Sequence, residues 1–415
     1  MQQEHNIASF TKFYALSLLV YVLAMYDVTW LNKVPVTLLR GFIILICLLK
    51  MFGASSLKVS RNQILPIILL LLYCVYSIVI THSGDPYVTI RYVAVFISMS
   101  SVFLLTYDEK LYVLRFFTSG FVFILLISLF GWVLFLLGVD LPHSGLIYHS
   151  NGFHEYYDYY FFRITSQSIG SDFPRFQSIF LEPGQMATPC VFLFFLNSFE
   201  NKVFGRKNLV LLAAIILSFS LISYGLMLIS FVTIAWTKGA RWKVPLTIIV
   251  VLVIGGVYYL ASSSEDNAIN ALILSRLEYD EETIISGNNR TADVFDLYYA
   301  DFINSNDKYF GIHNKLSSGY DWTNNSSGYK KFIVHDGIVG MVIFMALIIT
   351  MFLKNRNAKT LMFFIILVLA FLVRNLLQSP LWLSIAILGF YLLGNENNIK
   401  VNPIENNNDN YLINT

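Results

Sequence analysis

Long apolar runs follow one another along almost the whole chain, and they constrain the fold more than any other feature. Runs long enough for a helix to cross a bilayer, which takes roughly 20 residues, lie at 13–30, 34–52, 64–81, 87–106, 112–139, 178–199, 244–262, 331–353 and 360–378. A shorter run at 380–394 is marginal for a crossing. Of the 415 residues, 56% are hydrophobic and only 13% are charged, and the mean hydropathy is +0.62. We therefore predict an all-α polytopic membrane protein.

The segment 209–236 is either one steeply tilted helix or two short ones, and the charge pattern decides between them. Short loops rich in Lys and Arg mark the cytoplasmic side of a membrane protein. Such clusters recur along the chain: Lys50, Lys58 and Arg61; Lys110 and Arg115; Lys202, Arg206 and Lys207; Lys238, Arg241 and Lys243; Lys354, Arg356 and Lys359. Only a hairpin at 209–236, turning near Ser223-Tyr224-Gly225, keeps all of them on one side. The sequence thus predicts about twelve spans with both termini inside.

This topology divides the chain into membrane regions, two larger outer loops and a tail. The regions are 1–139 (five N-terminal helices), 140–177 (first loop), 178–262 (central helices), 263–330 (second loop), 331–394 (C-terminal helices) and 395–415 (tail). The tail has many Asn and few apolar residues, which predicts a disordered cytoplasmic segment. The first apolar run is followed by no small-residue cleavage site, so we expect it to be retained as a span.

Charge and cysteine content exclude few functions. The net charge of +2 indicates no particular partner, and no nucleic acid is expected. Cys47, Cys74 and Cys190 all lie inside apolar runs, far from polar neighbours. This placement indicates neither a metal site nor a disulfide network.

A layer of ionisable residues lies near the outer ends of the predicted spans, about one or two turns from each end. Its members are Asp27, Arg40, Arg91, His335, Asp336 and Arg374, whereas the cytoplasmic halves carry almost none. Snorkelling to the interface explains any single member. Six at one depth indicate a polar cavity open to the outer leaflet, and we take Arg91 and Arg374 as candidate substrate-binding residues.

The stretch 174–187 joins the first outer loop to the next span. Pro183 disfavours the α conformation at Glu182 and is itself suited to the first helical position. The helix therefore begins with free N–H groups and the positive end of its dipole at the membrane face, with Arg175 just outside. A cation beside a helix N-terminus suits a phosphate-bearing ligand. The plainer alternative is that Glu182 only caps the helix and that Arg175 only snorkels.

The second outer loop holds individual basic residues rather than a basic patch. From Glu265 to Lys330 it contains eleven acidic and five basic residues, so it does not attract anions in general. Arg276 and Arg290 must therefore act singly, unless they only pair with nearby acids such as Glu278 or Asp293. His313, which lies between Ile312 and Asn314 just upstream of a membrane entry, is the candidate base of this loop.

Four motifs occur in a fixed order. They are Arg175-x4-Phe-Leu-Glu-Pro-x3-Ala187, then Arg290 ahead of an aromatic-rich segment, then Gly311-x-His313-Asn314, then Asp336-Gly337-Ile-x-Gly340. In this order they resemble the bacterial O-antigen polymerase and ligase superfamily, and the Glu-Pro form looks more like the polymerases (Wzy type). The resemblance covers residues from about 170 to 345. One departure is Ser223-Tyr224, where relatives often carry Ser-Arg.

The resemblance implies a GT-C-like glycosyltransferase architecture and a substrate class. Oligosaccharide repeat units on polyprenyl pyrophosphate would be joined on the periplasmic side of the inner membrane, with the growing chain passing to the incoming unit. A lipid pyrophosphate leaves without protonation, so the reaction needs positive charge at the leaving group and a base for the acceptor hydroxyl.

The predicted site follows from that chemistry. Guanidinium groups grip phosphate bidentately, so Arg175 and Arg290 are assigned to the pyrophosphate, with Arg276 in support. His313 matches the family position for a base or an acceptor-orienting group, and Glu182 is the reserve candidate. Asn314 is a further candidate substrate-binding residue, and the tyrosines at 156–160 and Trp322 are suited to stacking on sugars or to anchoring at the interface.

We expect neither a metal nor any other cofactor, because the outer carboxylates form a consecutive run typical of a solvated face rather than a cluster. The expected partners are the lipid-linked oligosaccharide, inner-membrane lipids, a chain-length-regulating membrane protein and a flippase. Two alternatives stay open. A ligase moving finished glycan to lipid A core would use nearly the same residues, whereas a flippase would need polar residues through the full membrane depth.

The alternating basic loops yield a topology prediction. A reporter fused at about Asn267 should be periplasmic, and one at about Lys238 should be cytoplasmic, because the clusters must stay on one face. Enzymatic reporters that are active on only one side of the membrane measure this directly. Both fusions reporting the same side would rule out the hairpin at 209–236.

Overall fold

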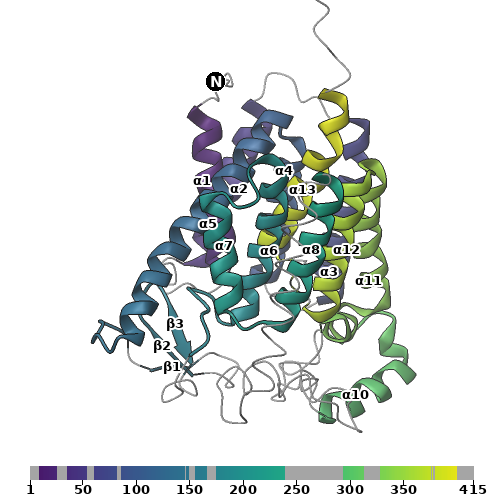
Figure 1. Cartoon of the computed structure of the whole chain (residues 1–415). Coiled ribbons are helices and arrows are strands. Elements are labelled where there is room, and N and C mark those ends of the chain that lie inside the picture. Colours follow the sequence, from purple (N-terminus) through teal and green to yellow (C-terminus); the bar gives the residue numbers. More distant parts are fainter. Residues whose placement is uncertain are drawn as a thin grey trace, which may run out of the picture.

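The computed structural model describes residues 9–25, 35–53, 60–81, 86–144, 146–148, 155–165, 174–238, 293–312, 328–374, 376 and 379–399. These residues form a bundle of helices with a small sheet and a short helix, α10 (Asp293–Asn304), at one end (Figure 1). The bundle helices are α1 (Ser9–Ala24), α2 (Val36–Gly53), α3 (Arg61–Thr81), α4 (Pro86–Leu104), α5 (Tyr107–Leu136), α6 (Pro183–Glu200), α7 (Arg206–Leu217), α8 (Leu221–Lys238), α11 (Gly328–Lys354), α12 (Ala358–Val373) and α13 (Pro380–Ile399).

In this part of the chain, five helices are long and apolar enough to cross a membrane: Arg61–Ile80, Pro86–Leu104, Tyr107–Leu136, Leu221–Lys238 and Gly328–Lys354. Shorter apolar helices occur at Ser9–Ala24, Ala358–Val373 and Pro380–Gly394. The prediction of a helical membrane protein is confirmed at this level. The number of spans stays a prediction, because the expected span at 244–262 lies outside the described residues.

Helices α6 and α13 lie in the middle of the bundle (Figure 1). A helix that is apolar on all sides must be covered on all sides, and nearly every residue of α6 from Met186 to Ser198 is buried. The Phe192 ring meets the Trp382 ring of α13 edge-on, with centroids 5.1 Å apart. The run at 380–394, marginal by length, is therefore a central packing helix.

Successive helices alternate in direction, which defines two ends. At one end α1 begins and α13 stops, and the short loops there carry the Lys and Arg clusters; we call it the basic end. The other end carries the sheet and α10, and we call it the sheet end. Ion pairing of Arg115 with Glu200 and a 2.6 Å hydrogen bond from Lys207 to Ser119 hold α5, α6 and α7 together at the basic end.

The hairpin expected at 209–236 is present as α7 and α8, but its turn is at 218–220 rather than at Ser223-Tyr224-Gly225. Phe219 adopts a left-handed conformation (φ 48°). The Ser218 hydroxyl donates to the Ile215 carbonyl at 2.6 Å and accepts from the Ser220 amide at 3.3 Å. Serine side chains that bond to local backbone compete with helix continuation, and this stops α7 one turn earlier than expected.

A three-stranded antiparallel sheet in the first outer loop is an addition to the all-α prediction. Its strands are β1 (Leu146–Tyr148), β2 (Glu155–Asp158) and β3 (Arg163–Thr165), in the order β1-β2-β3. A buried ion pair between Asp158 and Arg163 closes the β2–β3 turn at 2.9 Å. The strands are only three or four residues long, too short for the sequence to show clear alternation.

The tail boundary is also different from the prediction. Helix α13 continues to Ile399, four residues beyond the expected start of the tail at 395. The polar residues of this last turn lie past the apolar run, so hydropathy alone placed the end too early. Residues 400–415 lie outside the described residues.

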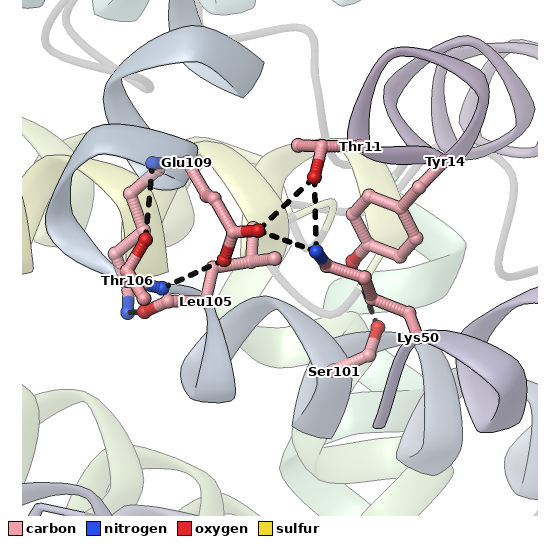
Figure 2. A network of polar contacts seen from close by, with 8 residues as sticks. Thr11, Tyr14, Lys50, Ser101, Leu105, Thr106 and Glu109 are labelled. Carbon is pink, nitrogen blue, oxygen red and sulfur yellow. Dashed lines mark hydrogen bonds and ion pairs between the residues drawn. The ribbon is translucent and has the colours of Figure 1, made fainter. Parts of the chain in front are cut away.

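Figure 2 shows the polar network that ties the basic end together. Lys50 of α2 pairs with Glu109 of α5 and donates to the hydroxyl of Thr11 in α1 at 2.9 Å. Thr11 in turn donates to Glu109 at 3.0 Å. Glu109 also forms a capping box with Thr106 at the start of α5. Three helices are thus joined through one carboxylate.

Removal of either charge from this network should destabilise the protein. The Lys50 and Glu109 side chains are only 14% and 22% exposed, so Lys50→Met leaves a shielded carboxylate without its partner. We expect a loss of about 2–3 kcal/mol in the free energy of unfolding, measured by denaturant titration in detergent. Arg115→Met is the matched control, because Arg115 is 49% exposed and such pairs contribute at most about 1 kcal/mol. Equal losses for the two variants would contradict this account.

Candidate functional site

A cavity of about 320 Å³ opens between five helices at the sheet end. Its polar lining comes from Arg40 of α2, Tyr73 of α3, Arg91 and Tyr92 of α4, Gln185 of α6 and Ser379, just before α13. Apolar atoms come from Met25, Val95, Leu181, Leu376 and Pro380. The cavity expected from the layer of ionisable residues is therefore present, and Arg91 lines it as predicted.

Two arginines share this cavity. Among the described residues that line it none is acidic. The Arg40 Nε atom is buried and has no hydrogen-bond partner in the described part of the chain, and the same holds for Gln185 Oε1. Arg91 is exposed, but the buried Nε of Arg40 is a donor without an acceptor among the described residues, which is costly. The arrangement therefore suits an anionic ligand that supplies an acceptor to Arg40.

The Glu182–Arg374 ion pair lies at the edge of the cavity. Glu182 is the N-cap residue of α6, but its side chain makes no capping hydrogen bond and pairs with Arg374 Nη1 instead. The guanidinium lies against Gly184, where a Cβ would be 2.8 Å from Arg374 Nε. Leu181, Gln185 and Leu376, the sequence neighbours of this pair, line the cavity. The structure thus pairs Glu182 with Arg374, and Arg91 lines the cavity; their assignment to substrate binding stays a prediction.

Arg175 has a different environment from the one expected. Its Nε donates to the Ser218 carbonyl at 3.1 Å and its Nη2 to the Phe219 carbonyl at 2.8 Å. These carbonyls end α7, where the helix dipole is negative and backbone acceptors need donors. Arg175 therefore supplies a cation at the α7–α8 turn. Its assignment to a pyrophosphate stays a prediction.

Helix α11 is broken at Gly337, beside Asp336. Gly337 has φ 71°, and a Cβ there would lie 2.6 Å from the backbone of Phe310. The segment after α10 fills the break, since the Ile312 amide donates to the Val334 carbonyl at 2.9 Å and Val339 donates to Tyr309 at 3.1 Å. Broken membrane helices are tolerated where other parts of the protein satisfy the freed backbone groups.

Of the ionisable pair at this break, Asp336 faces the protein interior, whereas the side chain of His335 is 28% exposed. Asp336 is 3% exposed, and its Oδ2 lies 3.1 Å from Nδ1 of His335. Tyr76 donates to the Asp336 carbonyl at 2.6 Å. An ionisable pair buried at a helix break is a common feature of functional sites in membrane proteins. It belongs to the predicted polar layer, although it does not line the cavity.

The remaining predicted site residues lie outside the described residues: Arg276, Arg290, His313 and Asn314, together with Asp27 of the polar layer. Reasoning from the sequence placed Arg40 in that layer without assigning it to the site, although a charge inside an apolar run was the available signal. It missed Gln185, Tyr73 and Tyr92. Tyrosines inside apolar spans are too common to be informative. In the described part of the chain, no cluster of three or more His, Cys, Asp or Glu is suited to a metal ion.

The bundle and its cavity define a helical membrane protein with a cavity lined in part by two arginines at one end. Comparisons of the chain with models of known protein families, with characterised proteins and with solved structures find no match. The assignment of a function therefore depends on the chemistry of the cavity and on the ordered motifs.

The contacts of Arg175 lead to a prediction that separates a structural role from a catalytic one. Arg175→Ala removes two charge-assisted hydrogen bonds to the end of α7, and we expect the free energy of unfolding in detergent to fall by about 1.5–3 kcal/mol. Arg175→Lys should recover only part of it, because lysine lacks the planar fork. Unchanged stability of Arg175→Ala together with lost activity would instead favour a direct contact with pyrophosphate.

Proposed function

We propose that this chain is a glycosyltransferase of the bacterial inner membrane that polymerises oligosaccharide units linked to polyprenyl pyrophosphate. The growing chain would pass from its lipid carrier to the incoming lipid-linked unit on the periplasmic side, which corresponds to the sheet end. The observation that carries the proposal is the cavity with Arg40 and Arg91, no acidic residue among its described lining and a buried guanidinium atom without a partner.

A lipid pyrophosphate fits the requirements of this cavity. Its phosphate oxygens supply the acceptor that the buried Arg40 Nε lacks among the described residues, Gln185 Oε1 would accept from a bridging water, and the charge of the phosphates offsets the two guanidinium groups. The polyprenyl chain would leave through the apolar side of the site, where Met25, Val95 and Leu376 lie. The sugar would face the loops at the sheet end, including the predicted Arg290 and His313.

The reaction needs charge stabilisation more than any other contribution. Departure of the pyrophosphate develops negative charge on its terminal oxygen, and fixed guanidinium groups stabilise that charge more in the transition state than in the ground state. No metal is required for this task, because the arginines supply the positive charge. The acceptor hydroxyl must also lose a proton, which assigns a base to the same end of the protein.

A flippase is the weaker alternative. It would need polar groups through the membrane depth, whereas at the basic end Lys50 and Glu109 satisfy each other rather than line the described cavity. A ligase uses the same donor chemistry, and the product distinguishes it. In cells lacking this protein, single repeats on lipid indicate a polymerase and long unattached chains indicate a ligase.

The cavity arginines give the test of this proposal. We expect Arg40→Ala and Arg91→Ala each to reduce polymerisation by roughly two to three orders of magnitude, as for the loss of one transition-state donor. Arg→Lys should restore part of the activity, since lysine keeps the charge but not the bidentate fork. Activity is measured as glycan length in cells and as transfer by purified protein with lipid-linked substrate.

Arg115→Ala is the control, because this exposed arginine lies at the basic end. It should leave glycan length unchanged. Normal long-chain glycan from both cavity variants at unchanged protein levels would contradict the proposal.

A further inference from the structure

The Glu182–Arg374 ion pair is close in sequence to several residues that line the cationic cavity. Glu182 precedes α6, Arg374 ends α12, and the residues beside each of them line the cavity. The two side chains differ in access, with Arg374 15% and Glu182 39% exposed. A carboxylate held by a guanidinium, yet open to the outside, is thus placed next to the proposed pyrophosphate site.

Arg374 has donors left over for a second anion. A guanidinium has five N–H groups, and Glu182 takes a bond from Nη1. The Nε of Arg374 is buried without a hydrogen-bond partner among the described residues. Gly184 keeps the space beside the guanidinium free of a side chain, since a Cβ there would be 2.7 Å from Cζ. Among the described residues, Glu182 is therefore the only hydrogen-bond partner of the Arg374 guanidinium.

We propose that Glu182 is the proton acceptor for the acceptor hydroxyl, and that the pyrophosphate of the donor frees it by taking over Arg374. This inference rests on the proposed function and adds a catalytic residue to it. A pyrophosphate carries more negative charge than a carboxylate and offers a guanidinium two oxygens at once. Bound beside Arg40 and Arg91, it competes with Glu182 for the same donors.

The transfer of Arg374 from Glu182 to the pyrophosphate changes the proton affinity of the Glu182 carboxylate. A nearby cation favours the charged form of a carboxylate and makes it a poor proton acceptor; loss of that cation has the opposite effect. Donor binding thus turns Glu182 into a base only when a leaving group is in place. His313, predicted as a base or an acceptor-orienting group, would then orient the acceptor.

The chemical step balances without any further reactant. The acceptor oxygen forms a bond to the anomeric carbon of the donor sugar, and the bond from that carbon to the pyrophosphate oxygen breaks. The electron pair of the broken bond leaves with the polyprenyl pyrophosphate, which Arg40, Arg91 and Arg374 hold. The hydroxyl proton passes to the Glu182 carboxylate.

Tyr156 of β2 is close enough to Glu182 for the carboxylate to affect its pKa. Burial raises the pKa of Tyr156, and the charge of Glu182 raises it further. Tyr156 is 3% exposed, whereas Glu182 is 39% exposed. The carboxylate is therefore accessible to an incoming sugar.

The test measures binding and transfer separately, in purified protein reconstituted in nanodiscs. Binding uses a polyprenyl diphosphate without sugar, and transfer uses the lipid-linked substrate. We expect Glu182→Gln to bind the diphosphate more tightly than the wild type, because Arg374 no longer has a competing carboxylate, while transfer falls by about two orders of magnitude or more. Arg374→Ala should weaken diphosphate binding at least about tenfold, the effect of one charge-assisted hydrogen bond.

Glu182→Ala with added formate tests the base independently. The small carboxylate enters the space left by the side chain, so transfer should rise with formate concentration, whereas Gln185→Ala should show no such response. Unchanged or weaker diphosphate binding by Glu182→Gln, wild-type transfer by that variant, or no formate response of Glu182→Ala would each overturn the inference. Failure of the wild-type protein to bind the diphosphate would overturn the proposed function instead.

Discussion

Positive charge without a matching negative charge, placed at one end of an apolar bundle, is the constraint on which the rest of this structure depends. Arg40 and Arg91 share a cavity whose described lining has no acid, and the Arg40 Nε has no acceptor in the described part of the chain. Arg91 is exposed, but a buried donor without an acceptor, such as the Arg40 Nε, destabilises a protein. The proposed anionic ligand would supply that acceptor.

At the opposite end of the bundle, the buried cations have hydrogen-bond or ion-pair partners within the protein. At the basic end, Lys50 meets Glu109, and Lys110 donates to the Phe103 carbonyl at 2.8 Å and also to the Leu105 carbonyl, which closes the end of α4. Every one of these cations has a partner within the protein. At the sheet end Arg163 and Arg374 are likewise paired, whereas the Arg40 Nε is buried without a partner among the described residues, and this is the observation behind the proposed anion site.

Backbone geometry positions the groups of the sheet end. The break of α11 at Gly337 and the α7–α8 turn at Phe219 both leave backbone groups that need partners at the end of the bundle. Residues 309–312 satisfy the first, and Arg175 satisfies the second. These contacts hold residues 309–312 against the break in α11 and Arg175 against the end of α7.

The sequence by itself determined the class of fold. The length of each apolar segment and the positions of Lys and Arg in the loops are local properties, and they decide directly how a chain inserts into a bilayer. The sequence also located the polar layer, because a charged residue inside an apolar segment can be recognised without knowing its contacts in space. Only the tertiary structure decided which members of that layer meet. Arg175 was expected at a ligand and lies at backbone carbonyls, whereas Arg40 received no role and lines the cavity. Arg374 and Glu182 are 192 positions apart, and no local pattern pairs them. Which charged side chains pair depends on how the helices pack side by side. That packing is determined by residues throughout the bundle, not by the residues next to each charge in the sequence.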